Sequence, residues 1–106
     1  LITQLSHVFD MKDLGPLHYF LGLEISYSST GLTVTQTKYL HDLLQKSSMV
    51  DCKPCKTPCA ASSRLSKTTG SPLLDPTPYR SLVGALQYLT FTRPDISFAV
   101  NTACQY

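Results

Sequence analysis

No run of apolar residues in this sequence approaches the length that is needed to cross a membrane. The first ten residues, LITQLSHVFD, also lack the basic segment and the cleavage pattern of a signal peptide. An initiator methionine is missing, and the last residues, NTACQY, fall inside a helical pattern that has no capping residue. We therefore expect a fragment of a longer chain that has no membrane partner.

Several signatures of catalytic sites are missing as well. The sequence contains neither a P-loop nor a G-x-G-x-x-G motif, and no serine or cysteine stands in the context of a nucleophilic triad. Charge is sparse: 9 basic and 7 acidic residues give a net charge of +2, which excludes a polyanion-binding tail. The 106 residues, 42% of them hydrophobic, are enough for at most one small domain with a core.

A β-hairpin is predicted between residues 17 and 36. Apolar residues alternate with others from Leu17 to Tyr27, which is the period of a strand with one buried face. Residues 28–31, SSTG, supply turn chemistry, and the alternation resumes after them. Gly22 stands inside the first strand, where a glycine indicates a bulge or a close approach of the backbone to a neighbouring strand or to a phosphate.

Three segments show helical spacing of their apolar residues. Residues 1–11 are expected to be the end of an amphipathic helix that a Gly-Pro pair breaks. A helix over residues 37–49 follows the hairpin, with Thr35 or Thr37 as its cap. Residues 79–106 carry two apolar stripes joined by a short Pro-containing turn, a pattern that is typical of an αα-hairpin.

Residues 50–78 have a different composition. They include five prolines and many serine, threonine and alanine residues, which predicts an extended connector with little apolar surface to bury. Four basic residues lie here without an acidic residue among them: Lys53, Lys56, Arg64 and Lys67. This positive charge would suit a nucleic-acid backbone, and it would equally suit a solvated linker, so both interpretations stay open.

Three cysteines of the connector have the spacing C-x2-C-x3-C, which can begin a zinc site: Cys52, Cys55 and Cys59. A fourth ligand would have to come from Cys104 or from a histidine, and none of these has the paired spacing of a zinc finger. The favoured interpretation is that the cysteines are incidental and stay reduced, because nothing in the sequence indicates secretion.

Two blocks of the sequence resemble one known family in content and in order. The run FDMKDLGPLHYFLGLEIS, followed by GLTVTQTKYLHDLL, resembles the segment after the catalytic aspartates of copia-type retrotransposon reverse transcriptases. YRSLVGALQYLTFTRPDISFAVN resembles the next block of the same Pol polyprotein family, and a short KTP stands between the two. The resemblance implies an α+β fold: a polymerase palm fragment, made of a helix and an antiparallel β-hairpin, followed by helical thumb-like segments.

The resemblance also implies a division of the chain into four parts. Residues 1–36 would end the palm, residues 37–49 would open the thumb, residues 50–78 would connect, and residues 79–106 would form a truncated αα-hairpin. Five residues of the hairpin would act like the primer grip, which holds the terminal primer phosphate so that the 3′-hydroxyl lies in line: Phe20, Leu21, Gly22, Leu23 and Glu24.

Four basic residues are further candidates for contact with the nucleic-acid backbone: Lys38, Lys46, Arg80 and Arg93. Arg80 and Arg93 could instead pair with Asp75 and Asp95. The expected partner is an RNA/DNA template–primer, bound by the longer parent protein. By resemblance the parent is expected inside the cell, in a cytoplasmic particle or in the nucleus.

No catalytic residue and no metal ligand is assigned in this chain. The family carries an adjacent aspartate pair upstream of the segment seen here, whereas Asp10 and Asp13 are not adjacent. Polymerases of this class use two metal ions held by carboxylates, so Mg²⁺ or Mn²⁺ is expected as a cofactor of the full-length parent. The fragment alone is predicted to be inactive.

Three hypotheses about function follow. The chain is part of an RNA-directed DNA polymerase and positions the template–primer, or it is a non-enzymatic remnant of a transposable element. The third hypothesis is a small cysteine-dependent nucleic-acid-binding module. The coding sequence upstream of Leu1 separates the first two hypotheses, and zinc analysis of the purified protein tests the third.

Overall fold

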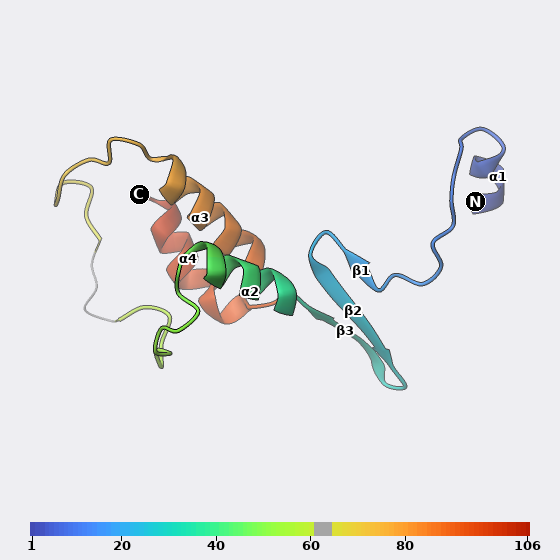
Figure 1. The fold of residues 1–106 in the computed structure, drawn as a ribbon, viewed down its shortest axis with the longest axis horizontal. Helices are drawn as coiled ribbons and strands as arrows, with labels where there is room; N and C mark the ends of the chain where they lie inside the picture. The colour runs from blue at the N-terminus through green and yellow to red at the C-terminus, as the bar shows by residue number, and fades with distance from the viewer. Residues whose placement is uncertain (61–64) are drawn as a thin grey trace.

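The computed structural model describes residues 1–60 and 65–106, and it confirms the α+β composition (Figure 1). The elements are α1 (Ile2–Ser6), β1 (Tyr19–Phe20), β2 (Leu23–Ser28), β3 (Gly31–Thr35), α2 (Thr37–Lys46), α3 (Thr77–Leu89), the short 3₁₀ helix η1 (Pro94–Ile96) and α4 (Ser97–Cys104). The radius of gyration is 19.2 Å, compared with about 13 Å for a compact domain of 100 residues. The molecule is therefore elongated.

The three strands form one antiparallel sheet in the order β1-β2-β3. The second turn, at residues 28–31, lies where the sequence predicted it, with Ser28 paired to Gly31. The prediction of one strand from Leu17 to Tyr27 is wrong, because the chain reverses between Phe20 and Leu23. Paired residues lie on one face of a sheet, so the reversal places Phe20 with Leu23 and Tyr19 with Glu24. The uninterrupted alternation of the sequence instead put Tyr19 on the same face as Leu23, and it therefore did not reveal the turn.

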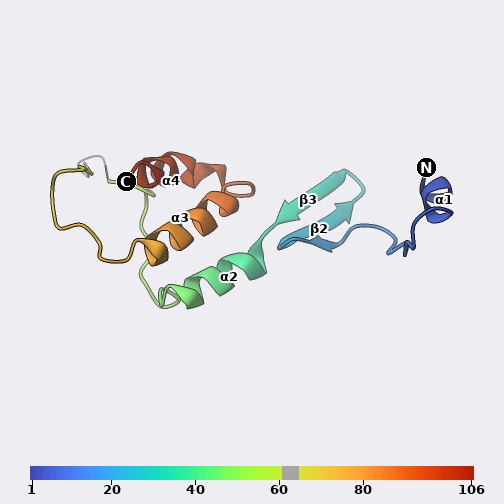
Figure 2. The ribbon, with the colours of Figure 1, turned by 90° about the horizontal axis from the view of Figure 1, so that it is seen from above.

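The N-terminal helix is shorter than predicted. It ends at Ser6 instead of continuing to Met11, and none of its residues is buried. Val8 and Phe9, which are apolar residues of the predicted helix over residues 1–11, lie beyond its end and are 73% and 60% exposed. A helix of this length has little stability of its own without a packed face, and α1 lies at the far end of the long axis, away from α2, α3 and α4 (Figure 1 and Figure 2).

Among the described residues the core is small and entirely helical. Its buried apolar residues are Leu43 of α2, Leu89 of α3 and Val100 of α4, and the three helices lie side by side (Figure 2). Two tyrosine hydroxyls join the helices, each donating to a backbone carbonyl. Tyr39 of α2 bonds to the oxygen of Ala85 in α3 at 3.1 Å, and Tyr79 of α3 bonds to that of Ala103 in α4 at 2.7 Å.

Between α2 and α3 the described residues form neither helix nor strand. Three of the four basic residues of this stretch, Lys53, Lys56 and Lys67, are exposed, and the fourth, Arg64, lies outside the described residues. Across the part of the chain that the structure describes, no helix has the length and apolar character that crossing a membrane requires.

Candidate functional site

The five predicted primer-grip residues come together at one end of the sheet. Phe20 and Leu23 are paired across β1 and β2, and Leu21 and Gly22 form the two-residue turn between them. Both turn residues have positive φ, 51° and 81°, which is the signature of a type I′ hairpin turn. The turn is therefore defined by its backbone, and Gly22 belongs to the turn and not to a strand.

Leu21 is unusual at its position in the turn. Type I′ turns favour Asn-Gly, because asparagine tolerates the left-handed conformation that costs other L-residues about 1–2 kcal/mol. The side chain of Leu21 is nevertheless 71% exposed, so packing within the described chain does not offset this cost. A strained residue with an exposed apolar side chain is typical of a functional position.

Two aromatic residues hold the turn from the helical side. The hydroxyl of Tyr88, in α3, donates a hydrogen bond to the carbonyl oxygen of Leu21. The ring of Tyr39, in α2, lies edge-to-face against that of Tyr88, with the centroids 5.3 Å apart. A Cβ placed on Gly22 would lie 3.5 Å from Cδ2 of Tyr39. The group that approaches Gly22 within the described chain is therefore an aromatic ring, and not a neighbouring strand.

Glu24 lies two residues after the turn and reaches the start of α2. Its carboxylate accepts hydrogen bonds from the backbone N–H of Lys38 at 2.9 Å and from the hydroxyl of Thr35 at 3.1 Å. The bond from the Lys38 N–H is the main reason why the pKa of Glu24 lies below its ordinary value. The predicted threonine cap is wrong: α2 has no side-chain bond from its own N-cap, and Glu24 from β2 takes this role.

Gln36 forms the joint between β3 and α2. It is 3% exposed, and its Oε1 accepts a hydrogen bond from the hydroxyl of Thr92, which lies in the link between α3 and α4. Within the described residues its Nε2 is buried and has no partner. This hydrogen bond joins the junction of β3 and α2 to the link between α3 and α4.

Two of the four predicted cationic contacts pair with carboxylates. Lys38 pairs with Asp42 at 2.8 Å on the exposed side of α2, and its pKa is raised chiefly by this hydrogen bond. Arg93 makes two bonds to Asp95, at 2.9 and 2.7 Å, and they lower the pKa of that carboxyl group. The alternative of an Arg93–Asp95 pair is therefore confirmed.

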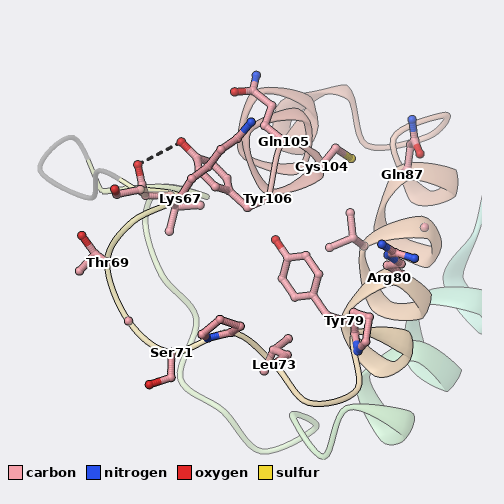
Figure 3. Close-up of a pocket in the computed structure, with 17 residues that line it drawn as sticks. Lys67, Thr69, Ser71, Leu73, Tyr79, Arg80, Gln87, Cys104, Gln105 and Tyr106 are labelled. Carbon is pink, nitrogen blue, oxygen red and sulfur yellow. Dashed lines mark hydrogen bonds between the residues drawn. The ribbon is translucent and has the colours of Figure 1, made fainter.

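The other two candidate cations are Lys46 in α2 and Arg80 in α3. Lys46 reaches the hydroxyl of Ser81 at 3.4 Å, whereas no ion pair of Arg80 is seen within residues 1–60 and 65–106. Asp75, the partner considered for Arg80, instead accepts the backbone N–H of Thr77. Arg80 lines a cleft of about 960 Å³ between residues 65–73 and helices α3 and α4 (Figure 3).

The cysteines do not assemble a metal site in the described structure. All four are free thiols; Cys59 is half-buried, and the other three are exposed. Among the residues whose positions are described, no group of three or more histidine, cysteine, aspartate or glutamate side chains could hold a metal ion. The described residues therefore fit neither a zinc site nor the carboxylate-bound Mg²⁺ or Mn²⁺ pair of a polymerase.

Tyr39 and Tyr88 are the residues at this site that the sequence analysis missed. Tyr39 was predicted only as part of the apolar face of its helix, and no role was predicted for Tyr88. One signal was present in the sequence: a partly buried tyrosine needs a hydrogen-bond partner for its hydroxyl. For Tyr88 that partner is the turn itself.

Comparison with known proteins identifies the family. Residues 1–61 match the family described as "Reverse transcriptase (RNA-dependent DNA polymerase)". The chain is 50% identical over 105 residues to the "Retrovirus-related Pol polyprotein from transposon RE1" of Arabidopsis thaliana. It is 38% identical over 111 residues to the polyprotein from transposon TNT 1-94 of Nicotiana tabacum. An uncharacterized mitochondrial protein of Arabidopsis thaliana shares 54% identity over 105 residues.

These matches span 99% of this chain for the mitochondrial protein and for RE1, and 96% for TNT 1-94. The chain spans only 43% of the mitochondrial relative and 7–8% of the two polyproteins. No solved structure matches the chain significantly. The resemblance to copia-type retrotransposon proteins is confirmed, and the chain belongs to the reverse transcriptase family as a segment that retrotransposon Pol polyproteins share.

Proposed function

We propose that this chain positions the template–primer in an RNA-directed DNA polymerase, and that other parts of the parent protein carry the chemistry. The observation that carries the proposal is the Leu21–Gly22 turn. It lies at the end of the sheet nearest the helices, with an exposed leucine in a strained conformation, and Tyr88 and Tyr39 contact it from the helices. Such a turn combines a hydrogen-bonded anchor with an exposed residue, Leu21, as a positioning element requires.

The backbone of the turn suits a phosphate. Positioning contacts to nucleic acids go largely to phosphate oxygens, and backbone N–H groups are among the donors. Holding the primer terminus in line for attack can contribute on the order of 7–11 kcal/mol at the upper end. A small displacement of the turn would then be costly in rate without any change in the reacting groups.

The four-part division of the chain is retained in this proposal. Residues 1–36 end the palm, residues 37–49 open the thumb, residues 50–78 connect, and residues 79–106 continue the thumb. Its support is the packing of α2 against α3 and of α3 against α4, which makes the helices on either side of the connector one unit.

The metal ions of the reaction belong to the parent. Mg²⁺ or Mn²⁺ would activate the primer hydroxyl and stabilise the leaving group, held by carboxylates of the kind that residues 1–60 and 65–106 do not bring together. The role of the chain is confined to the nucleic acid. Of its four candidate cations, Arg80 and Lys46 are proposed as the contacts to the duplex backbone, since Lys38 and Arg93 pair with carboxylates.

Photo-cross-linking tests the proposal in the polymerase that contains this chain. A photoreactive amino acid replaces Leu21 at the turn or, as a control, Leu32, which is 61% exposed and paired with Tyr27 at the opposite end of β2 and β3. With a labelled template–primer, Leu21 is expected to give an adduct on the primer strand near its 3′ end. The proposal is wrong if the Leu21 adduct is absent or no stronger than the Leu32 adduct.

A further inference from the structure

In the peptide group between Leu21 and Gly22, the carbonyl oxygen is hydrogen-bonded within the described chain and the N–H is not. Its carbonyl oxygen accepts the hydrogen bond of Tyr88, and no peptide bond between described residues is cis. In a planar trans peptide the C=O and the N–H point in opposite directions. The N–H of Gly22 therefore points away from Tyr88 and from α3.

That N–H has no partner within residues 1–60 and 65–106, since neither a backbone nor a side-chain group accepts it. Gly22 lies at the end of the sheet, between an exposed Leu21 and a half-buried Leu23. Gly22 is itself half-buried and keeps partial access to solvent, and an unpaired amide in such a turn is a donor for an anionic oxygen.

We infer that Tyr88 is a positioning residue of the polymerase reaction: by holding the Leu21 carbonyl, its hydroxyl aims the Gly22 N–H at a phosphate of the primer strand. This inference rests on the proposed function of the turn. Tyr88 does not touch the nucleic acid in this scheme and acts only through the peptide plane that it fixes.

Packing on two sides holds the Tyr88 ring in place. The ring lies edge-to-face against Tyr39 at 5.3 Å and against Phe91 at 5.7 Å, and the next residue of α3, Leu89, is 4% exposed. The hydroxyl of Tyr39 cannot replace that of Tyr88, because it already bonds to the carbonyl of Ala85. The Tyr88 hydroxyl of α3 therefore sets the orientation of the peptide between Leu21 and Gly22.

The test compares two Tyr→Phe variants in the parent polymerase. Tyr88→Phe removes the bond to the turn and keeps the aromatic packing. Tyr79→Phe is the matched control, since it removes a hydroxyl–carbonyl bond of the same kind between α3 and α4. Each variant is measured by thermal melting and by single-turnover primer extension, which separates the incorporation rate from nucleotide affinity.

If the Gly22 N–H is no longer held in its orientation, the rate of nucleotide incorporation should fall. Tyr88→Phe is expected to lower the incorporation rate by between tenfold and about a hundredfold, since a displacement of about 1 Å can cost a hundredfold. Nucleotide affinity should be unchanged, and the melting temperature should fall no more than in Tyr79→Phe. Equal rate losses in the two variants would overturn the inference, because they would reduce Tyr88 to a structural role.

A primer with one neutral methylphosphonate linkage provides a second measurement. The rate loss that this linkage causes should not change if Tyr88 has only a structural role. Scanning this linkage along the primer should reveal one position where the wild type slows by about tenfold or more, as for the loss of a hydrogen bond to a charged group. Tyr88→Phe should lose most of this sensitivity, while Tyr79→Phe should keep it.

The two proposals fail in different ways. Undiminished methylphosphonate sensitivity in Tyr88→Phe, together with a specific primer cross-link from Leu21, would overturn the role of Tyr88 and leave the function of the turn intact. A missing cross-link from Leu21 would overturn the proposed function itself.

Discussion

The sheet and the helices of this molecule are stabilised in different ways. Each of the three main helices contributes one buried apolar residue: Leu43, Leu89 or Val100. No residue of β1, β2 or β3 is buried, and the sheet is tied to the helices by individual hydrogen bonds from Glu24, Gln36 and Tyr88. Polar contacts are directional and apolar packing is not, so the helices give stability and the hydrogen bonds give the sheet its orientation.

The comparison explains why the turn is suited to positioning. A turn that was buried in a core would be rigid but inaccessible, and a free hairpin would be accessible but poorly oriented. Here Leu21 and Gly22 stay open on one side, while Tyr88 and Tyr39 hold them on the other. Substitutions in the helices and in the turn should therefore have different effects.

The largest expected effect is the complete absence of chemistry in the isolated chain. Neither the sheet nor the helices supply an adjacent aspartate pair, so catalytic metal ions would have no anionic site. Primer extension with the purified chain and Mg²⁺ or Mn²⁺ should give no incorporation above a blank. Template-dependent incorporation would show that the division of roles between this chain and its parent is wrong.

The difference in packing should appear when leucines are truncated in the two regions. Leu89→Ala, in the core, is expected to cost about 2–5 kcal/mol in free energy of unfolding. Leu32→Ala, in β3, should change it by no more than about 0.5 kcal/mol, because the side chain is 61% exposed. Denaturant unfolding of both variants measures the contrast, and similar costs at the two positions would contradict it.

Features that depend on local signals could be predicted from the sequence, and features that depend on contacts between distant residues could not. Helical spacing placed the start of α2 correctly, and turn chemistry placed the reversal at Ser28 to Gly31, because both signals are local. The apolar alternation runs through Leu21 and Gly22 without a change of phase, so it favoured one continuous strand, whereas the observed turn places Phe20 and Leu23 on the same face. The role of Tyr88 depends on a contact with Leu21, which is 67 positions away, and no local pattern contains that information.

Substitutions at Gly22 test the backbone of the turn. With φ at +81°, Gly22→Val should lose roughly 1–2 kcal/mol of stability from backbone strain, whereas Gly22→Asn should lose less, because asparagine tolerates this conformation. An added Cβ would lie 3.5 Å from Tyr39, which is an ordinary van der Waals contact, so backbone strain accounts for the expected loss. Thermal melting of the two variants gives the comparison, and equal melting temperatures would argue against a left-handed Gly22.

The smallest expected effect concerns Glu24 and pH. Its pKa is lowered in the folded protein, mainly by the hydrogen bond from the Lys38 N–H. The ionised carboxylate therefore stabilises the fold above the ordinary glutamate pKa of about 4.3, and this contribution is lost as the pH falls through the lowered value. Wild type should melt higher than Glu24→Gln at pH 7, and the difference should vanish in acid.

Asp51→Asn is the control for this effect. Asp51 is an exposed carboxylate in the loop after α2, and its replacement should leave the melting temperature unchanged across the same pH range. A difference between wild type and Glu24→Gln that stayed constant with pH would show that the carboxylate charge does not tie the sheet to α2.

The most direct test of the central claim is a structure of the parent polymerase bound to a template–primer. The account predicts that the N–H of Gly22 donates to a primer phosphate oxygen, with a nitrogen–oxygen distance of about 2.7–3.2 Å, while the Tyr88 hydroxyl still bonds to the Leu21 carbonyl. A complex in which this turn faces solvent or protein, with the primer terminus held elsewhere, would contradict it.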